Sequence, residues 1–428
     1  MSDPTRWSAP AMQARLRRRR AAERRFRRLG LAAVGLALVA LVVLLASIAW
    51  NGASAFVRTQ IALDVDFAPE LVGAVARPAA EAEIAEIDWA ALVREALARD
   101  FPGVSERSER RALFGLASRG AQDVVRDRLL ADPSLVGRSE RIWVPASADV
   151  DALVKGRLPR DAQGGRFSEQ ELGWVRSLEE RGLVRRSFDW NFLTAGDSRQ
   201  PELAGVGGAV VGSFLTLLVT LAVAFPLGVA AAVYLEEFAP RSRATELIEL
   251  NINNLAAVPS IVFGILGLAF FLGTLGLPRS APLVGGLTLA LMTLPTIIVA
   301  GRGAILAVPP SIREAARGLG ASPLQVVVHH VLPLALPGIL TGTIIGMARA
   351  LGETAPLLMV GMVAFVVDVP RSFSDAATAL PVQIYLWADS PERAFVEKVS
   401  GAILVLLAFL GAMNGTAIWL RQRFERRW

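Results

Sequence analysis

The chain has 428 residues, a mean hydropathy of +0.45 and 53% hydrophobic residues, and several of its apolar stretches exceed the roughly 20 residues that cross a bilayer. These values exclude an ordinary soluble protein and predict a polytopic membrane protein. Because the chain has no cysteine, disulfides, thiolate metal sites and cysteine nucleophiles are excluded as well.

Much of the net charge of +6 comes from arginines that concentrate near the two ends, in 15–28 and 421–427, each beside an apolar run. This distribution is typical of the positive-inside rule and favours contact with anionic lipid over nucleic-acid binding. We predict a basic cytoplasmic tail over 1–29, a first transmembrane helix over 30–50 that ends near Trp50, and cytoplasmic termini. The apolar run is longer than the roughly 7–15 residues of a signal-peptide core, so we interpret it as an uncleaved anchor.

Residues 51–204 are predicted to form a segment outside the cytoplasm that is large enough for a small domain. The segment is expected to be mostly helical, because apolar periodicity occurs in 81–99 and 109–130. Ser168, with Glu171 three residues later, predicts the start of another helix with a capping box.

The same segment contains an extended stretch, 141–145, and an acidic run. The acids of the run are Glu81, Glu83, Glu86 and Asp88. We interpret the run as a solvated helix face, and a docking surface for a solute-binding protein is the alternative. The segment has no histidine and no metal-ligand spacing, so we predict no catalytic or metal site in it.

Residues 205–428 are predicted to form five further transmembrane helices, which gives an all-α polytopic membrane protein of about six spans. The five are expected over about 206–235, 255–275, 283–300, 337–367 and 399–420. With both termini inside the cell, the polar loop 311–333 falls on the cytoplasmic side.

The loop 311–333 begins with a predicted short helix. Ser311 and Glu314 have capping-box spacing, and Gly318 and Gly320 are expected to interrupt the helix because glycine adopts positive φ at little steric cost. Ala315 and Ala316 follow Glu314, and their small side chains suit close contact with another surface.

A second helix is predicted after the glycine elbow. Ser322 and Gln325 form another capping-box pattern around Pro323, and Leu332 before Pro333 is expected to close the helix. Helix, elbow and helix at a membrane surface suit docking onto another protein, and an unpartnered hairpin is the alternative. The adjacent His329 and His330 diverge on a helix, so we do not predict a metal site there.

One spacing within this loop resembles a known family. The residues that carry it are Glu314, Ala315, Ala316, Gly320, Leu332 and Pro333. They are similar to the EAA loop of bacterial ABC-importer permeases, although His330 stands where that family usually has an aliphatic residue. The resemblance implies that 205–428 is a permease core and that the loop inserts into a groove on an ATPase subunit. It also implies two ATPase copies and a second, homologous permease.

The predicted fifth span contains a run of charged and helix-breaking residues. The run consists of Arg349, Gly352, Glu353, Thr354 and Pro356, with two alanines and a leucine. Charged residues near the middle of a span normally face a partner or an aqueous path, and proline removes a helical hydrogen bond. Arg349 and Glu353 lie four residues apart and can pair. We predict a place on the translocation pathway, with a structural ion pair as the alternative.

This run, and the stretch 258–264, resemble phosphate-specific ABC permeases, and the resemblance extends over about 188–428. The fourth span departs from that pattern, since Val299 stands near an expected arginine and Arg302 follows later. The first outer segment is also longer than usual for the family.

The resemblance implies a non-enzymatic subunit of an ATP-driven phosphate importer in a bacterial inner membrane. It needs a phosphate-binding protein and a separate ATPase, contacts lipid, and uses no cofactor. A P-loop in this chain is excluded, because neither of its two lysines, Lys155 and Lys398, follows a glycine-rich loop. The alternatives are a permease for molybdate or sulfate, an ion-coupled secondary transporter, and a membrane sensor of phosphate.

Overall fold

The structure is a computed structural model, and it describes residues 10–72, 87–161 and 166–424. The chain divides into two compact units, 1–51 and 52–428, which are described separately. Most of the first unit is one helix, α1 (Pro10–Ala53), whose apolar side chains are exposed; Leu36, for example, is 72% exposed. Such a helix needs lipid around it, and it covers the predicted first span.

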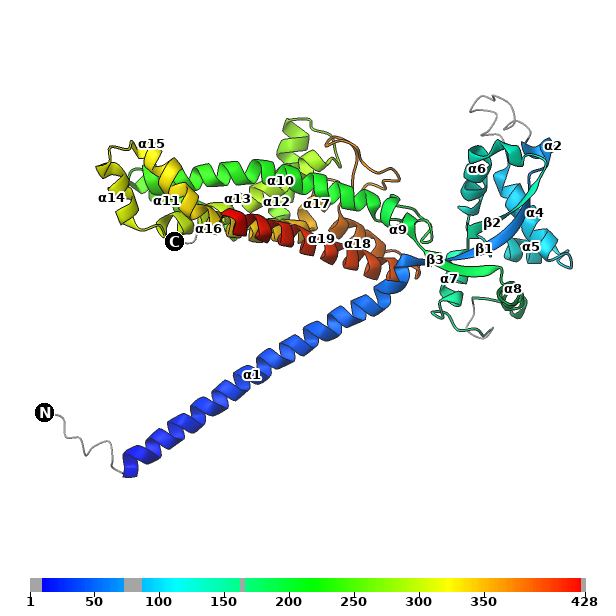
Figure 1. The fold of residues 1–428 in the computed structure, drawn as a ribbon, viewed down its shortest axis with the longest axis horizontal. Coiled ribbons are helices and arrows are strands. Elements are labelled where there is room, and N and C mark those ends of the chain that lie inside the picture. The colour runs from blue at the N-terminus through cyan, green and yellow to red at the C-terminus, as the bar shows by residue number, and fades with distance from the viewer. Residues whose placement is uncertain (1–9, 73–86, 162–165, 425–428) are drawn as a thin grey trace. The chain divides into compact units, whose positions relative to one another are not determined.

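The described residues contain five helices that are long and apolar enough to cross a membrane, or six if one bent pair counts as a span (Figure 1). In the second unit the four single helices are Gly207–Phe238, Pro282–Leu306, Pro323–Gly352 and Phe395–Arg423. The prediction of a mostly helical protein with about six spans is confirmed.

The bent pair differs from the predicted third span. α11 (Arg243–Ala256) is a separate helix with no buried residue, and it meets the next helix at an angle of 101°. The span itself consists of α12 (Ser260–Gly267) and the π-helical η7 (Leu268–Thr274), and it begins after Pro259 rather than at 255. The reason is that Pro259 disfavours helical backbone at the residue before it.

The predicted fifth span ends earlier than expected. α16 (Leu332–Gly352) stops at Gly352, a short α17 (Ala355–Met359) follows, and residues 360–379 have no helix. The prediction of one span over 337–367 is therefore wrong. α18 (Leu380–Ala388) then precedes α19 (Phe395–Phe424).

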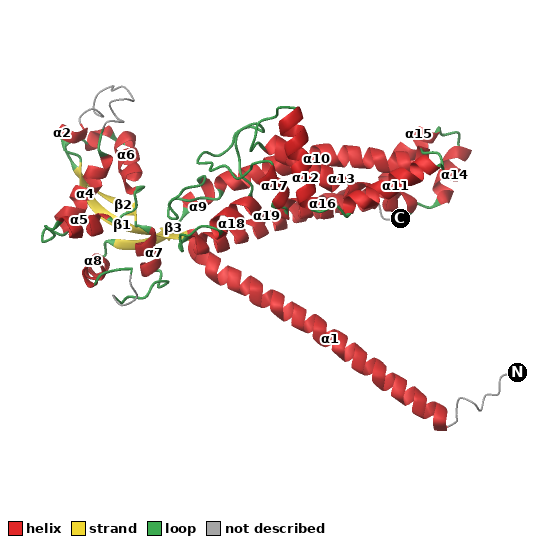
Figure 2. Ribbon diagram, turned by 180° about the vertical axis from the view of Figure 1, so that it is seen from behind, coloured by secondary structure: helices red, strands yellow, loops and turns green. Residues whose placement is uncertain are grey.

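Residues 52–188, called here the insert domain, contain a three-stranded antiparallel sheet in the order β2-β1-β3. Its strands are β1 (Val57–Asp66), β2 (Ser139–Pro145) and β3 (Val184–Phe188). Figure 2 shows strands in this domain and, among the described residues, nowhere else. β2 contains the stretch predicted to be extended, whereas β1 and β3 were not predicted.

Helices surround this sheet and were only partly predicted. They are α2 (Pro69–Val72), α4 (Trp89–Asp100), α5 (Arg107–Phe114), α6 (Ala121–Ala131), α7 (Ala148–Val154) and α8 (Glu169–Glu180). The predicted helix over 109–130 is two helices, separated by residues 115–120. Ser168 and Glu171 form the predicted capping box, with bonds of 2.7 and 3.2 Å.

Only one residue of the acidic run, Asp88, lies among the described residues. Glu81, Glu83 and Glu86 lie outside the described residues, as does the start of the predicted 81–99 helix. Asp88 caps α4 by accepting a 2.9 Å hydrogen bond from the amide of Ala91. A carboxylate at this position satisfies an amide that has no partner within the helix.

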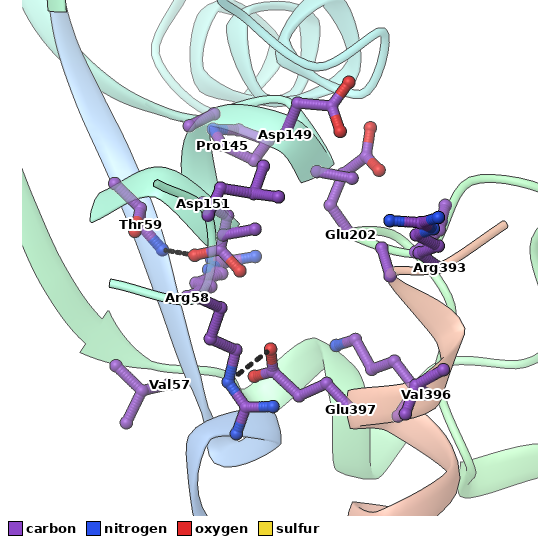
Figure 3. A pocket seen from close by; sticks show the side chains of 18 of the residues that line it. Val57, Arg58, Thr59, Pro145, Asp149, Asp151, Glu202, Arg393, Val396 and Glu397 are labelled. Atoms are coloured by element: carbon purple, nitrogen blue, oxygen red, sulfur yellow. Dashed lines mark hydrogen bonds and ion pairs between the residues drawn. The ribbon is translucent and has the colours of Figure 1, made fainter. Parts of the chain in front are cut away.

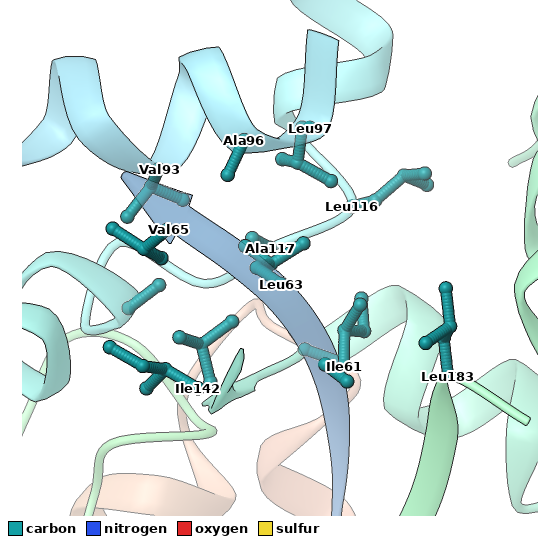
Figure 4. Close-up of a cluster of buried hydrophobic side chains, with 14 of the residues drawn as sticks. Ile61, Leu63, Val65, Val93, Ala96, Leu97, Leu116, Ala117, Ile142 and Leu183 are labelled. Atoms are coloured by element: carbon teal, nitrogen blue, oxygen red, sulfur yellow. The ribbon is translucent and has the colours of Figure 1, made fainter. Parts of the chain in front are cut away.

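Part of the core of the insert domain lies between the sheet and α4 (Figure 4). Ile61, Leu63 and Val65 alternate along β1, and the side chains of Val93 and Leu97 from α4 pack over them. Because all five are fully or almost fully buried, β1 is the central element of this domain.

Candidate functional site

The loop 311–333 begins differently from the prediction. α14 (Pro310–Gly318) starts one residue before Ser311, after Pro309, and no side chain caps it. The predicted capping box of Ser311 with Glu314 is therefore wrong. The physical reason is that Pro310 already has the φ of a first helical residue and lacks the amide that a cap would satisfy.

The elbow after α14 depends on one glycine. Gly320 has a φ of +86°, and its amide donates to the carbonyl of Arg317 at 2.9 Å, while the amide of Ala321 donates to that of Ala316 at 3.1 Å. This pair of bonds is a Schellman motif, which favours glycine at its left-handed position. Gly318 is instead the last residue of the helix, so it does not interrupt α14.

The second helix begins as predicted and does not end as predicted. Ser322 and Gln325 form a capping box at the start of α15 (Pro323–Val326), with Pro323 in its first turn. The helix then runs through the π-helical η8 (Val327–Val331) into α16, so Pro323–Gly352 is continuous. The wider π turn precedes Pro333, whose ring and missing amide disfavour a regular α turn.

One face of this hairpin is buried and the other is exposed. Ala316, Val326 and Val331 are at most 5% exposed and pack with Ile305 and Ile339 of the transmembrane helices. On the outer side three apolar side chains are exposed: Leu319 at 91%, Leu324 at 63% and Val328 at 45%. Large apolar side chains left exposed in this way indicate an interaction surface.

Among the predicted loop residues, the exposed ones are Glu314, Ala315 and Gly320; Ala316 is buried; and Leu332 and Pro333 are half-buried. The structure therefore brings the first four to the α14 elbow and places the last two within the continuous helix. His329 and His330 are both exposed in η8.

An ion-pair network attaches this hairpin to the transmembrane helices, and the sequence analysis missed it. Arg313 of α14 donates to Glu237 at 2.7 and 2.9 Å, and to the carbonyls of Val308 and Ile305 at 2.6 and 2.9 Å. Glu237 belongs to η6 (Tyr234–Phe238), the π-helical end of α10 (Gly207–Val233).

A second part of the network holds the neighbouring helices together. Arg302 of α13 (Pro282–Leu306) binds Glu236 at 2.5 Å and Glu249 of α11 at 2.9 Å. The sequence signal for this network is the adjacent pair Glu236 and Glu237 at the end of an apolar helix, because half-buried carboxylates need cationic partners. Arg302 is thus part of this network.

The predicted pathway residues lie where α16 ends. Gly352 is the last residue of α16, Glu353 has extended backbone with φ −77° and ψ 127°, and Pro356 lies in the first turn of α17. The structure therefore places Arg349 in the last turn of a helix and not in the middle of a span. Pro356 begins a new helix and does not kink an existing one.

Arg349 and Glu353 come together at this break. The Arg349 Nε lies 3.4 Å from the Glu353 Oε1, and the two side chains are 49% and 18% exposed. α17 packs closely on α12, because a Cβ added at Gly264 would lie 2.7 Å from the Cα of Pro356. Gly264 ends the 258–264 stretch, so the two stretches that resemble phosphate permeases are in contact.

Comparison with known proteins identifies the family. Residues 224–428 match the model of the binding-protein-dependent transport system inner membrane component, and residues 13–164 match a domain of unknown function, DUF3333. The phosphate transport system permease protein PstA 1 of Mycobacterium tuberculosis H37Rv is 33% identical over 256 residues, which cover 60% of this chain and 82% of that protein. The chain belongs to the PstA permease family.

Other PstA relatives agree with this membership. The PstA of Haemophilus influenzae is 30% identical over 51% of this chain and 76% of its own length. A probable PstA of Methanocaldococcus jannaschii is 33% identical over 54% of this chain and 80% of its own. An inward-facing structure of the MetNI methionine ABC transporter covers 52% of this chain and 95% of its own, at 20% identity and a TM-score of 0.40.

Membership in this family makes the chain a multi-pass inner membrane protein and a transport component of an ABC importer. It also implies an ATPase partner and a second permease. The DUF3333 match stops at residue 164, before α8 and β3, although β3 completes the sheet of the insert domain.

Proposed function

We propose that this PstA-family chain is the transmembrane permease subunit of an ATP-driven importer of inorganic phosphate. In this proposal the 311–333 hairpin docks on the ATPase, two copies of which serve the importer. A phosphate-binding protein delivers the substrate, both termini are cytoplasmic and the insert domain lies outside. The PstA relatives are phosphate transport system permeases, which supports phosphate over molybdate or sulfate.

One observation carries the coupling part of the proposal. The helix Pro323–Gly352 is continuous over 30 residues, or about 45 Å, from the hairpin to the break that holds Arg349 and Glu353. A rigid helix of this length moves at both ends together. Displacement of the hairpin by a closing ATPase would therefore reach the pathway residues directly.

The hairpin has the features that such a connection requires. Its exposed residues Leu319 and Leu324 offer apolar surface to a partner groove, and its buried face packs on the transmembrane helices. The bond from Arg313 to Glu237 transmits force to α10 as well. Two connections make the hairpin move as one body with the transmembrane helices.

The break has the features of a pathway element. Arg349 is half-exposed, and Glu353 balances only one side of its guanidinium, so donors remain for an anion in transit. Thr354 adds a hydroxyl at the same bend. Irregular backbone at membrane depth is tolerated where it lines a cavity or is buried in protein.

Radiolabelled phosphate uptake tests this function in phosphate-starved cells that lack the chain. We expect the wild type to restore uptake, and Arg349→Gln/Glu353→Gln to be inserted and inactive. Arg107→Gln, which removes an exposed charge from the insert domain, is the matched control and should transport normally. Normal uptake by the double variant would show that the pair is structural, and restoration of sulfate or molybdate uptake alone would refute the substrate.

A further inference from the structure

The insert domain meets the permease core at a polar cavity of about 470 Å³ (Figure 3). One wall comes from β1 and α7 of the insert domain, with Arg58 and Asp151. The opposite wall comes from Glu202, Arg393 and the first turn of α19, which contains Glu397. None of these residues belongs to the hairpin or to the helix break described above.

The two lysines of the chain both lie at this junction, and each forms an ion pair there. Lys155 of the insert domain places its Nζ 2.8 Å from the Glu397 Oε1. Lys398 of α19 places its Nζ 3.0 Å from the Asp189 Oδ2 at the end of β3. The lysine side chains are 6% and 9% exposed, so this two-lysine clasp is buried and fixes the cavity walls.

Every carboxylate of the cavity already has a donor. Asp151 accepts from the Thr59 amide at 2.7 Å and from Lys155 at 2.6 Å. The remaining pairs are Asp149 with Arg166, Asp189 with Lys398, Glu397 with Lys155 and Arg157, and Glu202 with the Ser118 hydroxyl. No carboxylate is therefore left to attract a cation.

Two arginines of the same cavity retain unused donors. The Arg58 Nε is buried without a hydrogen-bond partner, and the nearest carboxylate oxygen, on Asp189, is 3.8 Å from its terminal nitrogen. The Arg393 guanidinium has no ion pair or side-chain hydrogen bond with any residue that the structure describes. Five basic and five acidic side chains line the cavity. Burial raises the pKa of Glu202, which favours its neutral form and leaves the basic groups in excess.

We propose that this cavity binds a phosphate group, with Arg58 and Arg393 as its ligands. Guanidinium groups recognise phosphate through paired N–H donors, and a partly desolvated site strengthens those bonds. The group could belong to free inorganic phosphate or to a phospholipid headgroup. A lipid source is compatible with the geometry, because the cavity reaches the first turn of α19, where Val396 is 65% exposed.

Equilibrium binding of radiolabelled inorganic phosphate to the purified full-length chain in detergent tests the first source. We expect saturable binding that weakens at least tenfold in Arg393→Gln and in Arg58→Gln. Arg107→Gln on the same domain should bind as the wild type does, and Arg349→Gln is measured beside it to separate this site from the helix break. Arg393 lies on an exposed loop, so its variant remains informative if Arg58→Gln does not fold.

Mass spectrometry of lipids retained by the same proteins tests the second source. A phospholipid kept by the wild type and by Arg107→Gln, and lost from Arg393→Gln, identifies a headgroup. If the wild type binds neither ligand, or if Arg107→Gln weakens binding equally, the cavity is not a phosphate site. Phosphate binding lost only in Arg349→Gln would overturn this site while supporting the proposed transport function.

Discussion

Breaking the two-lysine clasp should release the insert domain from the permease core. Lys155→Met removes an ammonium that lies 2.6 Å from Asp151 and 2.8 Å from Glu397, and the lysine side chain is only 6% exposed. Removing one partner of a buried pair costs about 3–5 kcal/mol. We expect a value near the lower limit, about 3 kcal/mol, because Arg157 remains 3.5 Å from Glu397. The docking equilibrium should then fall by a factor of about 100.

Pulsed EPR can measure this release, because the chain has no cysteine of its own to label. Spin labels at Leu130→Cys in α6 and Tyr385→Cys in α18 report the distance between domain and core. The distribution should broaden in Lys155→Met. Arg160→Met breaks an exposed ion pair with Glu179 that is worth about 0.5 kcal/mol, and should leave it unchanged.

An unchanged distance distribution in a folded Lys155→Met protein would refute the clasp. Glu397→Gln combined with Lys155→Met provides a second check. In Lys155→Met alone the Glu397 carboxylate loses its lysine partner, whereas the double variant has a neutral amide at that position. We expect it to recover part of the lost docking, and a purely additive loss would show that the two side chains do not act as a pair.

Three further predictions concern single positions. Gly320→Ala should destabilise the hairpin by about 1 kcal/mol and reduce phosphate uptake, because φ is +86°, whereas Gly318→Ala, in a helix with equal space, should not. Ser322→Ala should cost about 1 kcal/mol of local stability, measured as faster hydrogen exchange in α15. Burial raises the pKa of Glu202 in the folded state, so stability should fall as pH rises from the unfolded pKa through the folded one. In Glu202→Gln, the thermal unfolding temperature should lack this decrease with pH.

Local sequence patterns predicted local structure well. The capping boxes at Ser168 and Ser322 formed because each needs only residues three apart. The box at Ser311 failed for an equally local reason, since Pro310 starts the helix one residue earlier. The Arg349–Glu353 pair likewise follows from spacing alone.

Long-range structure was harder to predict. Ile61 of β1 pairs with Val144 of β2 and with Val184 of β3. The pairing of β1 with β3 therefore joins residues that lie more than a hundred positions apart in the sequence. Neither neighbouring strand is close enough in sequence to form a hairpin signal. The clasp and the Arg313–Glu237 bond were missed for the same reason.

The end of α16 shows what hydropathy does not resolve. Residues 353–367 are apolar enough to continue a span, yet α17 and the following chain fold as a short helix and irregular backbone against α12 and α13. Burial in protein satisfies an apolar segment as well as lipid does, so composition alone does not distinguish them. Pro356 indicated a break in the helix, and the sequence did not indicate that α17 packs closely on Gly264 of α12.

The continuous helix changes how the two motifs relate to each other. Read from sequence, the hairpin and the charged break belong to separate elements, because Pro333 was expected to end the first of them. In the structure η8 absorbs that proline, and one helix joins the docking surface to Arg349. Mechanical coupling then requires no chain of intermediate contacts, since a displacement at Pro323 reaches Gly352 through helical hydrogen bonds.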